Sequence, residues 1–299
     1  IYTDAQFGDL CWSADESMVA FVAEEAKSAD GQQDYEEDMG EQLEGKVLPR
    51  LYTVAVSRTR GVVGDPVLVP GSGDSCCFGQ PQLTVGADGA PRCVFTGWYL
   101  ESKRLGVIYC PVRPAALFES KFEGDAWGYP RCLTATRFAV AHSPRVSPSG
   151  ARAIALAHRD VPTTHMACQA LLLVDLAAAR AQGPDADSAP CRVLLNEVRA
   201  SAAGASFAGL YSPCTTARAW LSDSEIVFSE SVRSRGRVLH LAIDDVPGGG
   251  PAAGTLSELQ PPNGAGGDAI RAPWAQRPFL LEGAAARAAG RAVGPRAGG

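Results

Sequence analysis

A polar turn set between two apolar segments recurs along this 299-residue chain, at residues 12–16, 85–89, 146–150 and, one residue shorter, 220–224. Ser, Pro, Asp and Gly recur at these positions. Tight turns select them because Pro presets φ, Asp and Ser bond to nearby backbone, and Gly accepts a positive φ. The pattern predicts four chain reversals between strands, with anchors at 13, 86, 147 and 222 that lie 73, 61 and 75 residues apart.

A short apolar run follows each turn, at residues 18–23, 93–98, 153–157 and 226–228. These runs hold β-branched or aromatic residues and hardly alternate with polar ones, so we expect strands that are buried on both faces. A further apolar segment completes the unit, as at residues 51–56, 170–176 and 238–244. Strand, turn, buried strand, loop and outer strand is the order found in a propeller blade, a small antiparallel sheet that packs face to face with its neighbours around an axis.

The spacing of the turns bears on the choice between two all-β folds. It exceeds the repeat of about 40 to 50 residues that is typical of plain propellers, so each blade is expected to carry long loops. The alternative is a β-sandwich, but sandwiches show turns every ~8 to 12 residues without a longer period. We therefore predict an incomplete β-propeller of about four blades over residues 1–246.

Composition divides the chain into two parts. From residue 247 onward Gly, Ala, Pro and Arg dominate, so residues 247–299 are expected to form a disordered tail. Residues 1–246 have an ordinary globular composition. Because the chain opens with Ile1 and leads straight into a predicted strand, we expect the gene product to begin earlier.

Charge and hydropathy exclude some classes of partner. The net charge of -6 argues against nucleic acid, whose phosphates require a basic surface. The acidic residues gather in residues 24–46, which read as a solvated loop. No apolar stretch approaches the roughly 18 residues of a membrane span, and the first residues do not resemble a signal peptide, so a cytoplasmic location is expected. The nine cysteines are scattered and odd in number, which favours buried thiols over disulfides. We do not expect redox activity even at the adjacent Cys76 and Cys77.

No motif for nucleophilic catalysis or phosphate binding is complete. The nearest match to the G-x-S-x-G nucleophile elbow is residues 204–209, where Ala208 replaces the second glycine that flanks Ser206. The string His158-Arg159-Asp160 imitates part of a kinase catalytic loop, but His165 stands where that loop requires Asn. The glycines at 248–250 open no helix that would hold a phosphate.

Metal-binding patterns are equally incomplete. Residues 34–40 resemble a calcium loop only faintly, because Met39 and Gly45 stand where an EF-hand needs Gly and Glu. His158 and His165 have no zinc-like spacing to other ligands. We therefore predict no catalytic, cofactor-binding or metal-binding residue in this chain, and no cofactor.

Several strings, in order along residues 1 to about 246, resemble acylaminoacyl peptidase, also called acylpeptide hydrolase or acylamino-acid-releasing enzyme, in the prolyl oligopeptidase family. They are residues 7–13 with 22–24, 35–41, 95–98 with 104–106, 143–148, 207–211 and 233–235. The resemblance implies a cytosolic serine-type exopeptidase that releases N-acylated amino acids from short acylated peptides. It also implies a seven-bladed propeller that gates access to a separate α/β-hydrolase domain, which carries the Ser-Asp-His triad downstream.

None of the triad positions lies in this chain, so the resemblance transfers no catalytic residue and the chain alone is predicted to be inactive. Its expected partners are the missing hydrolase domain, short N-acylated peptides in the complete enzyme and, in a homo-oligomer, further copies of the chain. Two alternatives stay open from the sequence: a stand-alone propeller that binds other proteins, and a truncated gene product without function.

Overall fold

The computed structural model describes residues 7–8, 10–24, 38–40, 43, 45–73, 75–100, 112–134, 137–161, 167–183, 188–198, 207–212, 214–232, 235–243 and 255–259. The regular secondary structure of this part of the chain consists of strands and one short helix, α1 (Leu176–Ala181). The all-β class expected from the sequence is therefore confirmed. The chain divides into two compact units, residues 1–215 and 216–299.

Unit 1 contains three groups of four antiparallel strands. The first sheet has the order β1 (Cys11–Trp12), β2 (Met18–Ala23), β3 (Arg50–Ser57) and β4 (Gly61–Leu68). The second sheet has the order β5 (Cys76–Val85), β6 (Pro91–Tyr99), β7 (Ala115–Glu123) and β9 (Arg131–Cys132), and β7 also pairs with β8 (Ala126–Trp127). The third sheet has the order β10 (Val140–Val146), β11 (Arg152–His158), β12 (Ala170–Asp175) and β13 (Cys191–Leu195).

The second and third sheets meet in one continuous ladder, but the connection is slight. β7 and β10 are parallel and share a single register pair, Val140 with Ala115. Parallel strands joined at one position do not form a stable ladder by themselves. The nine strands are thus best described as two four-stranded sheets that touch at one edge, with the short β8 as an additional strand on β7.

Unit 2 holds the fourth sheet, with the order β14 (Trp220–Ser222), β15 (Glu225–Val232), β16 (Arg235–Ala242) and β17 (Thr255–Glu258). The middle of β15 is buried at Ile226, Val227 and Phe228. Strand β17 lies inside the segment that the sequence analysis assigned to the tail, and it pairs with β16 from Leu239 to Ala242. Residues 247–254 and 260–299 lie outside the described residues, so the predicted boundary at residue 247 stays a prediction.

All four predicted turns connect the first strand of a sheet to its second strand. In the first and third sheets the same two backbone hydrogen bonds and one side-chain hydrogen bond close the turn. Ser13 N–H donates to Met18 O and Met18 N–H donates to Ser13 Oγ (2.9 Å each). Ser147 repeats this arrangement with Arg152, at 2.8 Å and 3.3 Å. The four apolar runs that follow the turns form second strands, and the further apolar segments form third strands.

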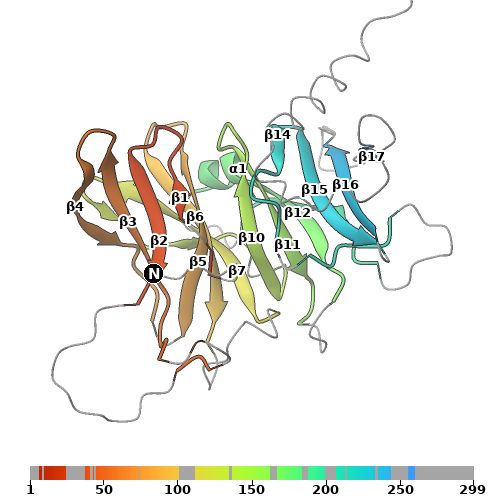
Figure 1. Cartoon of the computed structure of the whole chain (residues 1–299), viewed down its shortest axis with the longest axis horizontal. Coiled ribbons are helices and arrows are strands. Elements are labelled where there is room, and N and C mark those ends of the chain that lie inside the picture. The colour runs from red at the N-terminus through yellow and green to blue at the C-terminus, as the bar shows by residue number, and fades with distance from the viewer. Residues whose placement is uncertain are drawn as a thin grey trace, which may run out of the picture. The chain divides into compact units, whose positions relative to one another are not determined.

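Two apolar cores lie between successive sheets of unit 1. The first lies between the first and second sheets and includes Phe7, Leu51, Phe78, Phe95 and Trp98. The second lies between the second and third sheets and includes Val94, Leu117, Leu172 and the alanines at 153, 155 and 157. Val94 and Phe95 are neighbours on β6 and belong to different cores, as expected because successive strand residues point to opposite faces. The second sheet is therefore packed on both faces, and Figure 1 shows its strands β5, β6 and β7 together with β10 to β12 of the third sheet.

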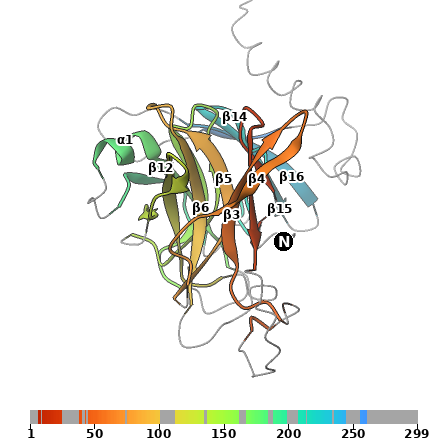
Figure 2. The ribbon, with the colours of Figure 1, turned by 90° about the vertical axis from the view of Figure 1, so that its left-hand side faces the viewer.

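Figure 2 views the first sheet from outside, with β3 and β4 in front of β5 and β6. A hydrogen bond crosses between these sheets where Trp127 Nε1 donates to Thr53 Oγ1 at 2.7 Å, and both side chains are buried. Among the described residues, no helix is long and apolar enough to cross a membrane.

Candidate functional site

Two irregular positions on the first strands of the second and third sheets carry the largest buried polar cluster in unit 1. Gln80 on β5 and Ser143 on β10 have φ of 53° and 56°, and each precedes a proline. The strand register shifts at both positions. A positive φ is uncommon in residues other than glycine and costs backbone energy, so these two bulges must be held by their surroundings.

Hydrogen bonds link these bulges from one sheet to the next. Gln80 N–H donates to Phe7 O at 2.6 Å, ahead of the first sheet. Gln80 Oε1 accepts from Ser143 N–H at 2.7 Å and from Thr96 Oγ1 at 2.8 Å. Ser143 Oγ in turn accepts from Thr215 N–H at 2.8 Å, at the end of unit 1. These bonds join the first strands of the second and third sheets, connect them to the segments that contain Phe7 and Thr215, and satisfy buried polar groups.

Close backbone approach explains a glycine in this cluster. A Cβ atom at Gly79 would lie 2.6 Å from Phe7 O and 2.9 Å from Phe7 Cα. These are backbone atoms that cannot rotate away, so a side chain at this position would push the first two sheets apart.

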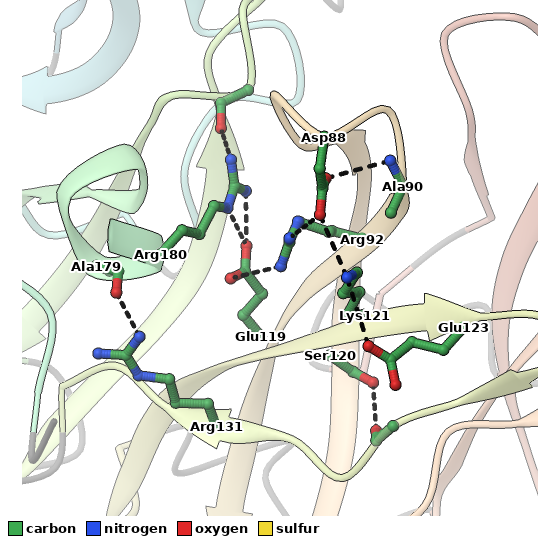
Figure 3. Close-up of polar contacts among 12 residues, drawn as sticks. Asp88, Ala90, Arg92, Glu119, Ser120, Lys121, Glu123, Arg131, Ala179 and Arg180 are labelled. Atoms are coloured by element: carbon green, nitrogen blue, oxygen red, sulfur yellow. Dashed lines mark hydrogen bonds and ion pairs between the residues drawn. The ribbon is translucent and has the colours of Figure 1, made fainter. Parts of the chain in front are cut away.

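A second polar cluster, centred on Glu119, also joins the second sheet to the third, and Figure 3 shows it. The buried carboxylate of Glu119 on β7 accepts from Arg180 Nε (3.0 Å) and Nη2 (2.6 Å), and it lies 3.7 Å from Arg92 Nη1. Arg180 also donates from Nη1 to Gly150 O at 2.8 Å, in the turn of the third sheet. Arg92 pairs with Asp88 at 2.9 Å, in the turn of the second sheet. Glu119 thus lies at the centre of a network that reaches two of the repeated turns.

Two arginines in this network have unused donors. Nε of Arg92 and both Nε and Nη2 of Arg131 are buried without a hydrogen-bond partner in the described part of the chain. Arg131 does donate from Nη1 to Ala179 O, at the end of α1. Arg92 lies so close to Gly86 that a Cβ there would clash with its Nε. The network is therefore closely packed, and its charges serve to join the sheets.

Two histidines are buried in the third sheet. Gln169 Nε2 donates to Ser212 O at 2.7 Å, so its Oε1 is the acceptor for His142 Nε2–H at 2.8 Å. Burial lowers the pKa of His142 to about 4, although the bond to Gln169 opposes this shift. Burial also lowers the pKa of His158, whose Nδ1 lies 3.5 Å from Glu197 Oε1. Both imidazoles are neutral at pH 7.

The residues of the incomplete catalytic and metal-binding motifs are either structural in their contacts or lie outside the described residues. His158 is buried at the end of β11, with only Glu197 beside Nδ1 and no partner for Nε2 among the described residues. Ser206, His165 and the glycines at 248–250 lie outside the described residues. So do residues 34–37 of the acidic run, but Asp38 is described and accepts from the backbone N–H groups of Gly40 (3.0 Å) and Gly45 (2.6 Å). That carboxylate closes a local loop.

Five of the described thiols in unit 1 are poor nucleophiles. Burial raises the pKa of Cys76 to about 12 and that of Cys191 to about 11, and it also raises the pKa of Cys11, Cys77 and Cys93. Because the thiolate is the reactive form, these side chains are unreactive near neutral pH. The described cysteines are all free of disulfides.

A nucleophile paired with a base is what covalent catalysis requires, and the polar clusters do not supply one. Ser143 Oγ contacts Thr215, whereas the adjacent His142 is bonded to Gln169. Within the described ranges, no group of three His, Cys, Asp or Glu side chains is placed to hold a metal ion. The two clusters therefore act on the packing of sheets, and sequence reasoning missed both. The only signal in the sequence was a polar residue before proline in the first strand of two successive units.

Comparisons with known proteins identify the family. The family model described as "Acylamino-acid-releasing enzyme, N-terminal domain" matches residues 25–248. The acylamino-acid-releasing enzyme of Mus musculus is 27% identical over 278 residues, which cover 83% of this chain and 35% of the relative. That of Homo sapiens is 27% identical over 266 residues, with 79% and 33% covered. That of Arabidopsis thaliana is 29% identical over 149 residues, with 42% and 19% covered.

The chain spans about a third of the length of the mammalian relatives. The family model, in contrast, covers most of the chain: it begins just after β2, continues through the later strands of unit 1, and ends just beyond β16. By this match, the chain belongs to the acylamino-acid-releasing enzyme N-terminal domain family.

Proposed function

We propose that the chain is the propeller portion of a serine hydrolase of the acylamino-acid-releasing type, and that it controls which peptides reach a catalytic domain encoded elsewhere. In this proposal the four sheets are four blades of the propeller. The substrates are short peptides with an acylated N-terminus, from which the hydrolase domain releases the N-acyl amino acid. The chain itself performs no chemistry.

The observation that carries this proposal is the repetition of one construction in unit 1. Three antiparallel sheets follow one another, each with a short hairpin between its first two strands. They pack face to face through two apolar cores, and the first strands of the second and third sheets are bonded to each other through Gln80 and Ser143. Face-to-face sheets with their first strands side by side are typical of propellers.

Rigid packing gives the proposed gating a physical basis. Buried side chains fill the spaces between the sheets, and polar bonds fix both ends of the junction between the second and third sheets. Closely packed interiors resist deformation, so a folded protein could not pass between blades, whereas a short flexible peptide needs only a small opening. This selection by size is the proposed role of the chain.

Sequencing the transcript on both sides of the region that encodes residues 1–299 tests the proposal. We expect a downstream frame that contains G-x-S-x-G followed by Asp and then His, in the order of an α/β-hydrolase triad. A stop codon directly after the region, in intact flanking sequence, would contradict the proposal.

The gating role has its own test on that longer product. Its rate on an acetylated dipeptide should be high, and its rate on the same acetylated residues at the terminus of a folded protein should be negligible. Deleting residues 1–243 should narrow this difference if the deleted product keeps its activity on the dipeptide. An unchanged difference would show that the sheets do not select the substrate.

A further inference from the structure

The two junctions of unit 1 are built from different side chains. The first core, between the first and second sheets, contains four buried aromatic residues from these sheets, namely Phe78, Phe95, Trp98 and Trp127. The second core, between the second and third sheets, meets β11 through alanines only, at 153, 155 and 157. Each aromatic side chain buries about 150 to 250 Å². The first junction is thus held mainly by apolar area.

The second junction depends more on directional polar bonds. Ser143 N–H donates to Gln80 Oε1 at one end (2.7 Å), and Arg180 holds Glu119 at the other (2.6 Å). Between them, Ala189 N–H donates to Leu133 O at 2.9 Å. Across the first junction, side-chain bonds in the described residues run from Trp127 to Thr53 and from Leu83 N–H to Cys11 Sγ, and neither involves a charged group.

These two kinds of attachment respond differently to a small separation. Apolar burial is non-directional and is lost in proportion to the area exposed. A hydrogen bond weakens steeply once its distance and angle leave a narrow range. The carboxylate of Glu119 is only 6% exposed and faces Arg180 and Arg92, so removing its charge leaves two arginines close together without their shared partner.

We infer that the junction between the second and third sheets opens before the aromatic junction, and that the ion pair of Glu119 with Arg180 holds it closed. We call this junction the hinge of unit 1. The opening itself follows from the contacts of unit 1. Its use as the passage for short peptides rests on the proposed function. The experiment therefore measures the opening directly, and its outcome does not depend on whether the chain gates an enzyme.

Backbone amides that cross each junction provide matched reporters of opening. Ser143 and Ala189 donate across the second junction, whereas Gln80 donates to Phe7 O and Phe78 donates to Pro49 O across the first. In the 299-residue chain carrying Glu119→Gln, hydrogen exchange of the first pair should become at least about tenfold faster. Exchange of Gln80 and Phe78 should change by less than about twofold.

Thr53→Val is the control, since it removes the acceptor of Trp127 at the first junction. This variant should speed exchange at Gln80 and Phe78 and leave Ser143 and Ala189 unchanged. If Glu119→Gln accelerated hydrogen exchange equally at all four amides, the two junctions would open together. If it accelerated exchange at none of them, Glu119 would not hold the second junction closed. Either result overturns the hinge.

The unmodified chain gives an independent arm if Glu119→Gln fails to fold. In increasing urea below the unfolding transition, exchange at Ser143 and Ala189 should accelerate at lower concentrations than exchange at Gln80 and Phe78. Acceleration of all four amides at one urea concentration would overturn the hinge without the use of any variant.

Discussion

At the scale of single residues, the fold depends on a few positions where backbone meets backbone. Gln80 and Ser143 hold a positive φ before proline, and their buried hydrogen bonds compensate for that strain. Gly79 allows Phe7 to lie against β5. These positions tolerate little change because the atoms around them belong to the main chain.

Gly79→Ala tests this close approach. The new Cβ would meet Phe7 O at 2.6 Å, so the variant should lower the free energy of unfolding by about 2 kcal/mol. Gly73→Ala is the matched control, since no atom lies within 4 Å of a Cβ at Gly73. Urea denaturation of both variants measures the effect, and equal stability of the two would contradict the packing described here.

The buried His142 predicts a loss of stability in acid. It is neutral in the folded chain, and its pKa falls from the ordinary 6.5 to about 4. Below pH 6.5 His142 takes up a proton in the unfolded chain but not in the folded chain. Its contribution to the free energy of unfolding is therefore fully present above pH 6.5 and declines between pH 6.5 and 4. The lost contribution of this residue reaches about 3 kcal/mol at pH 4.

Urea denaturation from pH 7.5 to 4 checks this expectation. His142→Gln has no titrating group at this position and should lose less stability over the same range. A variant whose stability declines with pH as steeply as that of the unmodified chain would contradict the assignment to His142.

At the scale of elements, the hairpin between the first and second strands is the repeated unit. Ser13 and Ser147 occupy equivalent places. Each side chain accepts a hydrogen bond from the backbone N–H of the first residue of the next strand. The equivalent position in the second sheet is Gly86, where Asp88 Oδ1 instead accepts from Ala90 N–H at 3.2 Å. The turn of the second sheet is also one residue shorter, because its closing bond runs from Gly86 N–H to Ala90 O.

Equivalence of the turns predicts similar costs for equivalent substitutions. Ser13→Ala and Ser147→Ala should each lower the free energy of unfolding by about 1 kcal/mol, because each removes a hydroxyl that accepts from backbone N–H groups: those of Ser17 and Met18 at Ser13, and that of Arg152 at Ser147. Thr59→Ala, in the exposed turn between β3 and β4, should stay within about 0.5 kcal/mol of the unmodified chain. Thermal unfolding followed by circular dichroism measures all three, and a large difference between the two serine variants would show that the turns are not equivalent.

The sequence predicted the first three strands of a sheet better than the fourth. Turn residues and unbroken apolar runs indicated the hairpins because both signals are local. The fourth strands gave weaker signals, since β4 is exposed from Gly61 to Pro66 and β9 has only two residues. Strand β17 was not expected because it lies in a Gly-, Ala- and Pro-rich segment. The contact of Glu119 with Arg180 joins residues 61 positions apart and left no pattern in the sequence.

At the scale of the whole molecule, repetition and family membership support each other. The four sheets repeat one construction, and the matched family model spans residues 25–248. The repetition accounts for the fold, but it does not indicate a reaction. In the described residues, the buried thiols, neutral histidines and paired charges lie within strands or join one sheet to the next. The polar groups of the described residues hold sheets together, and the proposed function assigns the chemistry to a separate domain.

Covalent labelling with a serine-directed fluorophosphonate tests that central claim most directly. The purified, folded 299-residue chain should remain unlabelled, and it should release no acetylated amino acid from an acetylated dipeptide, while a complete serine hydrolase labels fully under the same conditions. Stoichiometric labelling that requires the folded chain and maps to one of its serines would contradict the account, because it would reveal an activated nucleophile within these sheets.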